Sequence, residues 1–284
     1  MYKKFSNLSD FEWLELLKQS ITKKIIRGVK FPGFPDEATQ VLFTSHSYDA
    51  ALNEAYEFYR MVKKSAQTFN EPIGQQTQYL DFGVGWGRIM RMFLKDLNPD
   101  NIYGVDITPE ILTICQNLMT VGTLKLSKPH GSLDFTKETF DLVTAFSVFS
   151  HLSKDNGIHW IQEIHRVIKP AGLLIITTLS SSFVKLCLDV VKNPDSSEWA
   201  KQMAMSVNKS YPDHKSLLTN FPKDQLFYLS SGGGYDSMGH DDYGWAMVQE
   251  EFIRKQWSKW FDVVEFIDNP ESLPQAYITL RRKA

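Results

Sequence analysis

The chain has 284 residues, of which 43% are hydrophobic and 23% charged, as is typical of a globular protein with a substantial core. Its 31 basic and 33 acidic side chains leave a net charge of -2, which gives no general attraction to nucleic acid or to an anionic membrane. Two cysteines, Cys115 and Cys187, are too few for a disulfide framework, and no apolar run approaches the roughly 18 residues of a membrane span. We expect a cytoplasmic protein that opens without a signal peptide.

Two helices are predicted at the start of the chain. Residues 9–12 (Ser-Asp-Phe-Glu) form a capping box, and apolar residues follow at helical spacing as far as Ile25. A Phe-Pro-Gly-Phe-Pro segment at 31–35 ends this helix, and a second helix is expected over 50–67. These helices pack onto the core in the simplest interpretation; the alternative makes the loop at 44–48 a lid.

A glycine-rich turn follows the next apolar strand. Residues 79–88 read Tyr-Leu-Asp-Phe-Gly-Val-Gly-Trp-Gly-Arg, and a helical run is expected at 89–94. A strand that turns through glycines into a helix brings backbone N–H groups and a positive dipole end close to a ligand. The dinucleotide fingerprint would need a third glycine at position 88, which is Arg88 here. The glycines instead occupy positions 83, 85 and 87.

A second buried strand is predicted at 101–107, and it ends in an acidic residue. Asp106 follows Gly87 by 19 positions (106 − 87), close to the interval of about 20 residues at which a Rossmann-like unit places its ribose-binding carboxylate. Thr108-Pro109-Glu110 has the composition of a helix start. Asp106 as a simple cap of that helix is the alternative.

Strands and helices alternate from here to about residue 180. Further strands are expected at 122–127, 141–148 and 173–179, and this alternation predicts a parallel sheet with helices on both faces. Two last strands, 261–267 and 276–280, are joined by a short loop and are therefore expected to pair antiparallel. The 80 or so residues between contain predicted helices at 182–193 and 248–260, together with aromatic and glycine-rich stretches.

These segments resemble the class I S-adenosylmethionine-dependent methyltransferase family, of the small-molecule type. The resemblance rests on Asp81-x-Gly83-x-Gly85-x-Gly87 and extends over roughly 78–180, through the segments 140–152 and 163–172. It implies an α/β fold: a Rossmann-like seven-stranded, mostly parallel sheet with a C-terminal antiparallel hairpin, plus N-terminal helices and an inserted lid. It also implies an N-terminal helical cap at 1–70, a cofactor-binding core at 71–180 and 261–284, and a substrate-side insertion at 181–260.

The implied cofactor is S-adenosyl-L-methionine, with S-adenosyl-L-homocysteine as its product. In the family, the glycine turn cups the methionine part and an acid corresponding to Asp81 orients its amino group. Many relatives hold adenine with an Asp after the third strand, but the loop here reads Ser127-Lys128-Pro129-His130, so backbone groups or Ser127 would replace it. The expected cofactor-binding residues are Asp81, Gly83, Gly85, Gly87, Arg88, Asp106, Ile107, Ser127, Phe146 and Ser147.

Residues for the acceptor are assigned from their place in the fold. The catalytic candidates are His151, His240 and Asp242, and the substrate-binding candidates are Tyr48, Tyr235, Tyr243 and Trp245. A purely structural role for His151 is the alternative. No metal site is expected, because the adjacent residues 240–242 cannot easily converge on one ion.

The predicted function is methyl transfer to a small-molecule acceptor, with a hydroxyl favoured over an amine. The alternatives are a protein that binds S-adenosylmethionine without transferase activity, or transfer of another group from the same cofactor. The absence of a Pro-Pro pair excludes the signature of enzymes that methylate nucleic-acid amino groups. We therefore expect no nucleic-acid and no membrane partner, and a monomer or homodimer.

Overall fold

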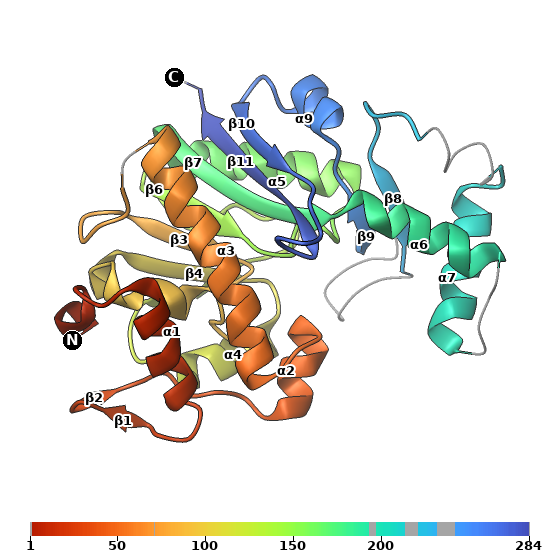
Figure 1. Cartoon of the computed structure of the whole chain (residues 1–284). Helices are drawn as coiled ribbons and strands as arrows, with labels where there is room; N and C mark the ends of the chain where they lie inside the picture. The colour runs from red at the N-terminus through yellow and green to blue at the C-terminus, as the bar shows by residue number, and fades with distance from the viewer. Residues whose placement is uncertain (1, 71, 193–196, 214–220, 232–241, 284) are drawn as a thin grey trace. The chain divides into compact units, whose positions relative to one another are not determined.

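The computed structural model describes residues 2–70, 72–192, 197–213, 221–231 and 242–283. A seven-stranded sheet has the order β10-β11-β7-β6-β3-β4-β5 (Figure 1). Its strands are β3 (Tyr79–Phe82), β4 (Ile102–Asp106), β5 (Thr123–Leu126), β6 (Phe140–Ala145), β7 (Ile168–Leu179), β10 (Phe261–Ile267) and β11 (Gln275–Arg282). β3 pairs in parallel with β4 and β6, β4 pairs in parallel with β5, and β10 and β11 form an antiparallel hairpin. The predicted fold class is confirmed.

The chain divides into two compact units. The first contains the residues up to Ala145 together with Arg166–Ile175, and the second contains Phe146–His165 together with Ile176–Lys283. The three-part division expected from the sequence stays a prediction. Among the described residues, no helix is long and apolar enough to cross a membrane.

The first helix of the chain is shorter than predicted. Its capping box is present, because the Ser9 N–H donates to Glu12 Oε2 over 2.8 Å and the Glu12 N–H donates to Ser9 Oγ over 3.2 Å. α1 (Asp10–Gln19) then stops six residues before Ile25, which lies in the small hairpin of β1 (Ile25–Ile26) and β2 (Val29–Lys30). Arg27 and Gly28 connect these strands with φ angles of 50° and 74°, the left-handed pair that a two-residue hairpin turn requires.

Further helical segments of the first unit precede β4, the second buried strand. η1 (Tyr2–Phe5) and α2 (Glu37–Thr44) were not predicted, whereas α3 (Tyr48–Phe69) confirms the helix expected over 50–67. The predicted helical run at 89–94 is a 3₁₀ helix, η2 (Met90–Lys95), rather than an α-helix. The buried Arg91 guanidinium donates to the carbonyls of Gly87 and Trp86 in the glycine turn. Short η3 (Pro99–Asn101) precedes β4, and α4 (Pro109–Leu118) follows it as expected.

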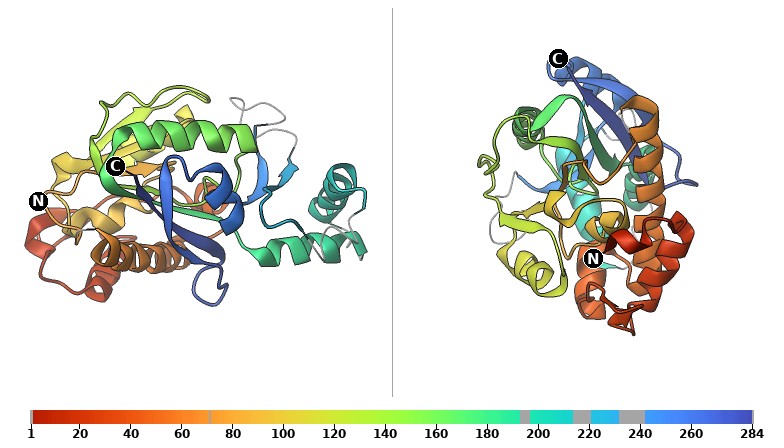
Figure 2. Two further views of the ribbon diagram at one scale, coloured as in Figure 1. Left: turned by 90° about the horizontal axis from the view of Figure 1, so that it is seen from above. Right: turned by 90° about the vertical axis from the view of Figure 1, so that its left-hand side faces the viewer.

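Besides β10 and β11, the second unit contains α5 (Lys154–Val167) as far as His165 and the other segments that follow β7. These are α6 (Ser181–Lys192), α7 (Glu198–Ser210), β8 (Phe227–Ser230), β9 (Gly244–Met247) and α9 (Glu250–Gln256). α6 and α7 pack against each other (Figure 2). They share an apolar cluster with β8 and β9. α6 confirms the helix predicted at 182–193, whereas α9 is shorter than the predicted 248–260. Both cysteines are buried free thiols.

Candidate functional site

Three polar residues lie at the carboxyl ends of three adjacent parallel strands in the first unit. Asp81 is near the end of β3, Asp106 ends β4, and Ser127 follows β5. The Ser127 N–H donates to the Asp106 carbonyl over 2.8 Å, so the last two strand ends are joined directly. We call these three residues the strand-end cluster. The carboxyl edge of an open parallel sheet is where α/β proteins bind their ligands.

The glycine turn is bonded to this cluster. Gly83, Gly85 and Gly87 all have positive φ, at 78°, 52° and 82°. The Asp106 carboxylate accepts from the Gly85 N–H over 2.9 Å and from the Thr108 N–H over 3.0 Å. Asp106 therefore holds the glycine turn and Thr108, the N-cap residue of α4, whereas its predicted contact with ribose stays a prediction.

Asp81 is a fully buried carboxylic acid with spare hydrogen-bonding capacity. Its Oδ1 accepts from the Thr144 hydroxyl over 3.3 Å, and Thr144 also contacts the Tyr79 hydroxyl at 2.7 Å. Its Oδ2 is buried and has no hydrogen-bond partner in the described part of the chain. Burial raises the pKa of Asp81 to about 7, because the charged form loses its hydration.

The other predicted residues of the first unit differ in their surroundings. Arg88 is buried, forms an ion pair with Glu54 of α3 and donates to the Ala51 carbonyl over 3.3 Å. Tyr48 begins α3, and its N–H donates to Gln40 Oε1 over 2.9 Å. The Arg88 guanidinium is thus engaged with α3. The contacts of Arg88 and of Ile107, which follows β4, with the cofactor stay predictions, as does the contact of Tyr48 with the substrate.

In the second unit, His151 is held in one tautomer. Its Nδ1 lies 2.8 Å from the Gly244 carbonyl oxygen, which can only accept, so Nδ1 carries the proton and Nε2 keeps its lone pair. The imidazole stacks on the Tyr243 ring with centroids 4.7 Å apart and an interplanar angle of 5°. Burial lowers the pKa of His151 because the cationic form is poorly solvated. The result is a neutral imidazole with a basic nitrogen.

Asp242 is fixed next to this stacked pair. The buried Asn156 amide donates to the Asp242 carbonyl over 3.1 Å and to its Oδ1 over 3.0 Å. His240 and Tyr235 lie outside the described residues. Trp245 belongs to β9 and packs against the apolar cluster of α6 and α7. His151, Tyr243 and Asp242 are therefore brought together, and Trp245 faces a hydrophobic core.

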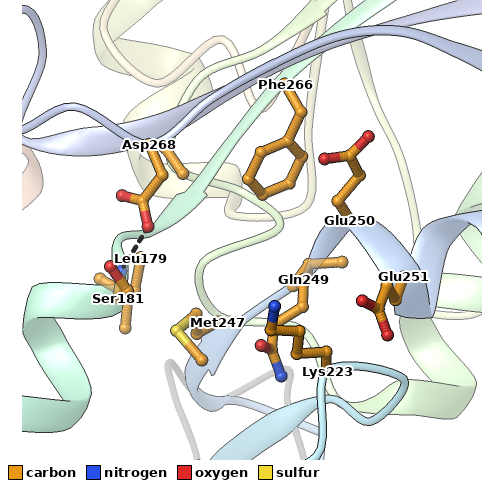
Figure 3. A pocket seen from close by; sticks show the side chains of 11 residues that line it. Leu179, Ser181, Lys223, Met247, Gln249, Glu250, Glu251, Phe266 and Asp268 are labelled. Atoms are coloured by element: carbon orange, nitrogen blue, oxygen red, sulfur yellow. Dashed lines mark hydrogen bonds between the residues drawn. The ribbon is translucent and has the colours of Figure 1, made fainter.

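A separate cavity of about 210 Å³ opens in the second unit, near the ends of β7 and β10 (Figure 3). Leu179, Met247 and Phe266 supply apolar surface, and Asp268 accepts from the Ser181 N–H over 3.0 Å. Of the predicted substrate residues that the structure describes, none lines this cavity. Among the residues that the structure describes, no group of three or more His, Cys, Asp or Glu is placed to hold a metal ion.

Comparison with known proteins identifies the domain around the glycine turn. A family model described as a methyltransferase domain matches residues 80–176, from β3 into β7. Residues 80–176 are therefore similar to a methyltransferase domain.

Relatives of this methyltransferase domain are distant. An S-adenosylmethionine-dependent methyltransferase from Clostridium acetobutylicum ATCC 824 superposes with a TM-score of 0.54 at 14% identity, over 87% of this chain and 97% of that one. The PH0226 protein of Pyrococcus horikoshii OT3 gives 0.50 at 13% identity, over 85% and 93%. The phosphoethanolamine N-methyltransferase of Plasmodium falciparum (isolate 3D7) is 24% identical over 107 residues, or 37% of this chain. The matched part spans only 40% of the length of that curated relative.

The sheet edge at the glycine turn has buried polar atoms without partners among the described residues and open space beside them. Asp81 Oδ2 and Ser127 Oγ are buried without partners in the described chain, and a buried unsatisfied polar atom costs about 1–3 kcal/mol. A methyl group added at Gly85 would meet no heavy atom within 4 Å, so open space adjoins the turn. Polar atoms that need partners next to open space fit a ligand that carries an amino group and hydroxyls.

Several residues that support the methyltransferase domain were not predicted from the sequence. Thr144 is the partner of Asp81 in the parallel pairing of β3 and β6. Placing the two predicted strands side by side in the sequence could have identified it. Asn156, Thr177 and Gln275 lack such a signal, because their partners are 30 to 98 positions away in the chain.

Proposed function

We propose that this chain transfers the methyl group of S-adenosyl-L-methionine to a small-molecule acceptor, with a hydroxyl favoured over an amine. The observation that carries the proposal is Asp81, whose buried Oδ2 lacks a partner at the sheet edge that also holds Asp106 and the glycine turn. An ammonium group that approaches this oxygen would satisfy it and would stabilise the ionised carboxylate.

Each residue of the strand-end cluster has a role in this proposal. Asp81 accepts from the amino group of the cofactor, Asp106 accepts from the ribose hydroxyls with its remaining lone pairs, and Ser127 supplies a hydroxyl for adenine. The bound cofactor supplies a methyl group on a sulfonium that is already an activated leaving group. The protein therefore needs to bind, align and exclude water rather than to activate the donor.

His151 is the proposed general base for the acceptor. A hydroxyl must lose its proton as the new bond to carbon forms, and Nε2 is the free lone pair of a neutral imidazole. Tyr243 and Asp242 are proposed to line the acceptor site beside it. A neutral amine has its own lone pair and needs no such base, so the tautomer of His151 favours a hydroxyl.

An amine acceptor is the second candidate. It is supported by the name of the Plasmodium falciparum relative, which specifies N-methylation of phosphoethanolamine. Because the match spans well under half of either chain, this acceptor does not carry over directly. The balanced charge of the chain supports a small molecule over nucleic acid in both cases.

A screen of acceptors tests the proposal. The full chain is incubated with S-adenosylmethionine and sets of hydroxylated, aminated or glycosidic small molecules, and S-adenosylhomocysteine formation is measured. We expect a hydroxylated compound to give product, and His151→Gln to reduce turnover of that compound without weakening cofactor affinity. Product from amines alone would select the second candidate. Cofactor binding with no product from any acceptor would favour a binding protein without transferase activity.

A further inference from the structure

A closed ring of hydrogen bonds surrounds Ser147, the second residue after β6. The Ser147 N–H donates to Thr177 Oγ1 over 2.7 Å, and the Thr177 hydroxyl donates to Gln275 Oε1 over 2.6 Å. The Gln275 amide nitrogen donates back to Ser147 Oγ over 2.7 Å. Because each group in the ring has a fixed role as donor or acceptor, the Gln275 amide has one orientation that satisfies all three contacts.

The ring holds Ser147 in an unusual backbone conformation. Its φ of 60° is left-handed, a region that residues with a Cβ seldom adopt unless their surroundings impose it. From there the chain makes one tight turn: the Ser150 hydroxyl donates to the Ser147 carbonyl over 2.8 Å, and the His151 N–H donates to the Val148 carbonyl over 3.0 Å. The direction in which the chain leaves Ser147 therefore sets where His151 lies.

The other side of His151 is fixed by β9. The Gly244 N–H donates to the His151 carbonyl over 2.9 Å, and the Ala246 N–H donates to the Ser150 carbonyl over 2.8 Å. These bonds bring Gly244 to the imidazole Nδ1, and they stack Tyr243 on its face. His151 thus lies between two anchors, the ring around Ser147 and the pairing with β9.

We propose that Thr177 and Gln275 are positioning residues for His151, because they hold Ser147 in the left-handed conformation from which the turn to the imidazole begins. The inference rests on the proposed role of His151 in methyl transfer and goes beyond it. The two residues come from β7 and β11, and neither contacts the imidazole.

Two substitutions at Thr177 separate positioning from packing. Thr177 is fully buried, and Thr177→Val keeps its shape while removing the hydroxyl that accepts from Ser147 and donates to Gln275. Thr177→Ser keeps the hydroxyl and removes a methyl group. A positioning role predicts that the Ser variant resembles the wild type and the Val variant does not, whereas a packing role predicts the opposite order. Gln275→Met is a second variant that keeps side-chain length and breaks the ring.

The readout is the NMR titration of the His151 ring in the full chain, with its resonance assigned by its loss in His151→Gln. The groups around the imidazole that bear on its pKa are the Tyr243 ring and the Gly244 carbonyl. Asp242, next to Tyr243 in the chain, is held by the Asn156 amide. A loosened turn admits water to the imidazole, so the pKa of His151 should rise by about half a unit or more in Thr177→Val and Gln275→Met. Thr177→Ser should titrate as the wild type does.

The proposal is overturned if Thr177→Val and Gln275→Met titrate as the wild type does, or if Thr177→Ser alone shifts. Urea unfolding of each variant identifies a change that comes from loss of the fold. Calorimetry of the wild type with S-adenosylhomocysteine tests the proposed function separately. If the wild type does not bind this compound, the proposed function fails, while the His151 titration still tests whether the hydrogen-bond ring around Ser147 positions the imidazole.

Discussion

The same substitution at two glycines of one turn should weaken different properties, mainly cofactor affinity at Gly85 and stability at Gly87. Gly85 and Gly87 both have positive φ, so replacing either by alanine places a side chain in the left-handed region, at a cost of about 1–2 kcal/mol. Their surroundings differ. A Cβ at Gly85 meets nothing within 4 Å, whereas a Cβ at Gly87 would lie 2.7 Å from Met119 Sδ and 3.3 Å from Cys115 Sγ.

These distances set the expected magnitudes. Gly87→Ala adds an overpacking cost of about 1–3 kcal/mol to the backbone cost, so the free energy of unfolding should fall by about 2–5 kcal/mol. Gly85→Ala should lose only the backbone share of about 1–2 kcal/mol, because its N–H still donates to Asp106. Its methyl group fills the open space proposed for the cofactor. Affinity for S-adenosylhomocysteine should therefore drop at least about tenfold, the equivalent of 1.4 kcal/mol.

The assay combines urea unfolding of the apo proteins with calorimetric titration by S-adenosylhomocysteine. Gly85→Ala should lose about 1–2 kcal/mol in the first measurement and bind clearly more weakly in the second, while Gly87→Ala should show the larger loss of stability. Unchanged affinity in Gly85→Ala, with its fold intact, would show that the cofactor does not lie against this face of the turn.

Three further predictions concern the ionisable groups. The pKa of Asp81, about 7 in the folded chain, lies above the value near 3.9 expected of an unfolded carboxyl, so the folded state holds this proton more tightly. The Asp81 contribution to the free energy of unfolding should therefore fall as pH rises from about 4 to 7. Urea unfolding of Asp81→Asn at several pH values should lack this fall. If the free energy of unfolding of Asp81→Asn depends on pH as that of the wild type does, the raised pKa does not belong to Asp81. Asp106→Ala removes the acceptor of the Gly85 and Thr108 N–H groups, so its free energy of unfolding in urea should fall by about 3–6 kcal/mol. Asp106→Asn should show a smaller fall. A fall below about 1 kcal/mol in Asp106→Ala would contradict this role. Once an acceptor is known, His151→Gln should reduce turnover of it by about 100- to 10,000-fold. Wild-type activity should persist below about pH 6.5, because the pKa of His151 is lowered and its imidazole stays neutral there. A variant as active as the wild type would show that His151 is not the general base.

The features that were predictable from the sequence are local in the chain. The turn at Gly83–Gly87 combines glycine spacing with a strand before it, and Asp106 ends the next strand at a regular interval. The last hairpin follows from two apolar runs joined by a short loop. Such patterns are visible because the residues that determine each structure are neighbours in sequence.

Features that depend on distant side chains were missed or placed wrongly. The run after the glycine turn is a 3₁₀ helix, although its apolar spacing alone looked like that of an α-helix. β6 was expected to reach residue 148 but ends at Ala145, before the left-handed Ser147 that Thr177 and Gln275 hold. The Thr177 to Gln275 contact joins residues 98 positions apart, so no local pattern marks it. The acceptor pocket belongs to this second group, which is why its residues remain proposals.

The most direct test of the central claim is calorimetric titration of the full wild-type chain with S-adenosyl-L-methionine and S-adenosyl-L-homocysteine at pH 6 and pH 8. The account predicts binding of both at one site per chain, tighter at pH 8, because an ionised Asp81 is the better partner for the ammonium of either compound. The absence of binding at both pH values would contradict the account.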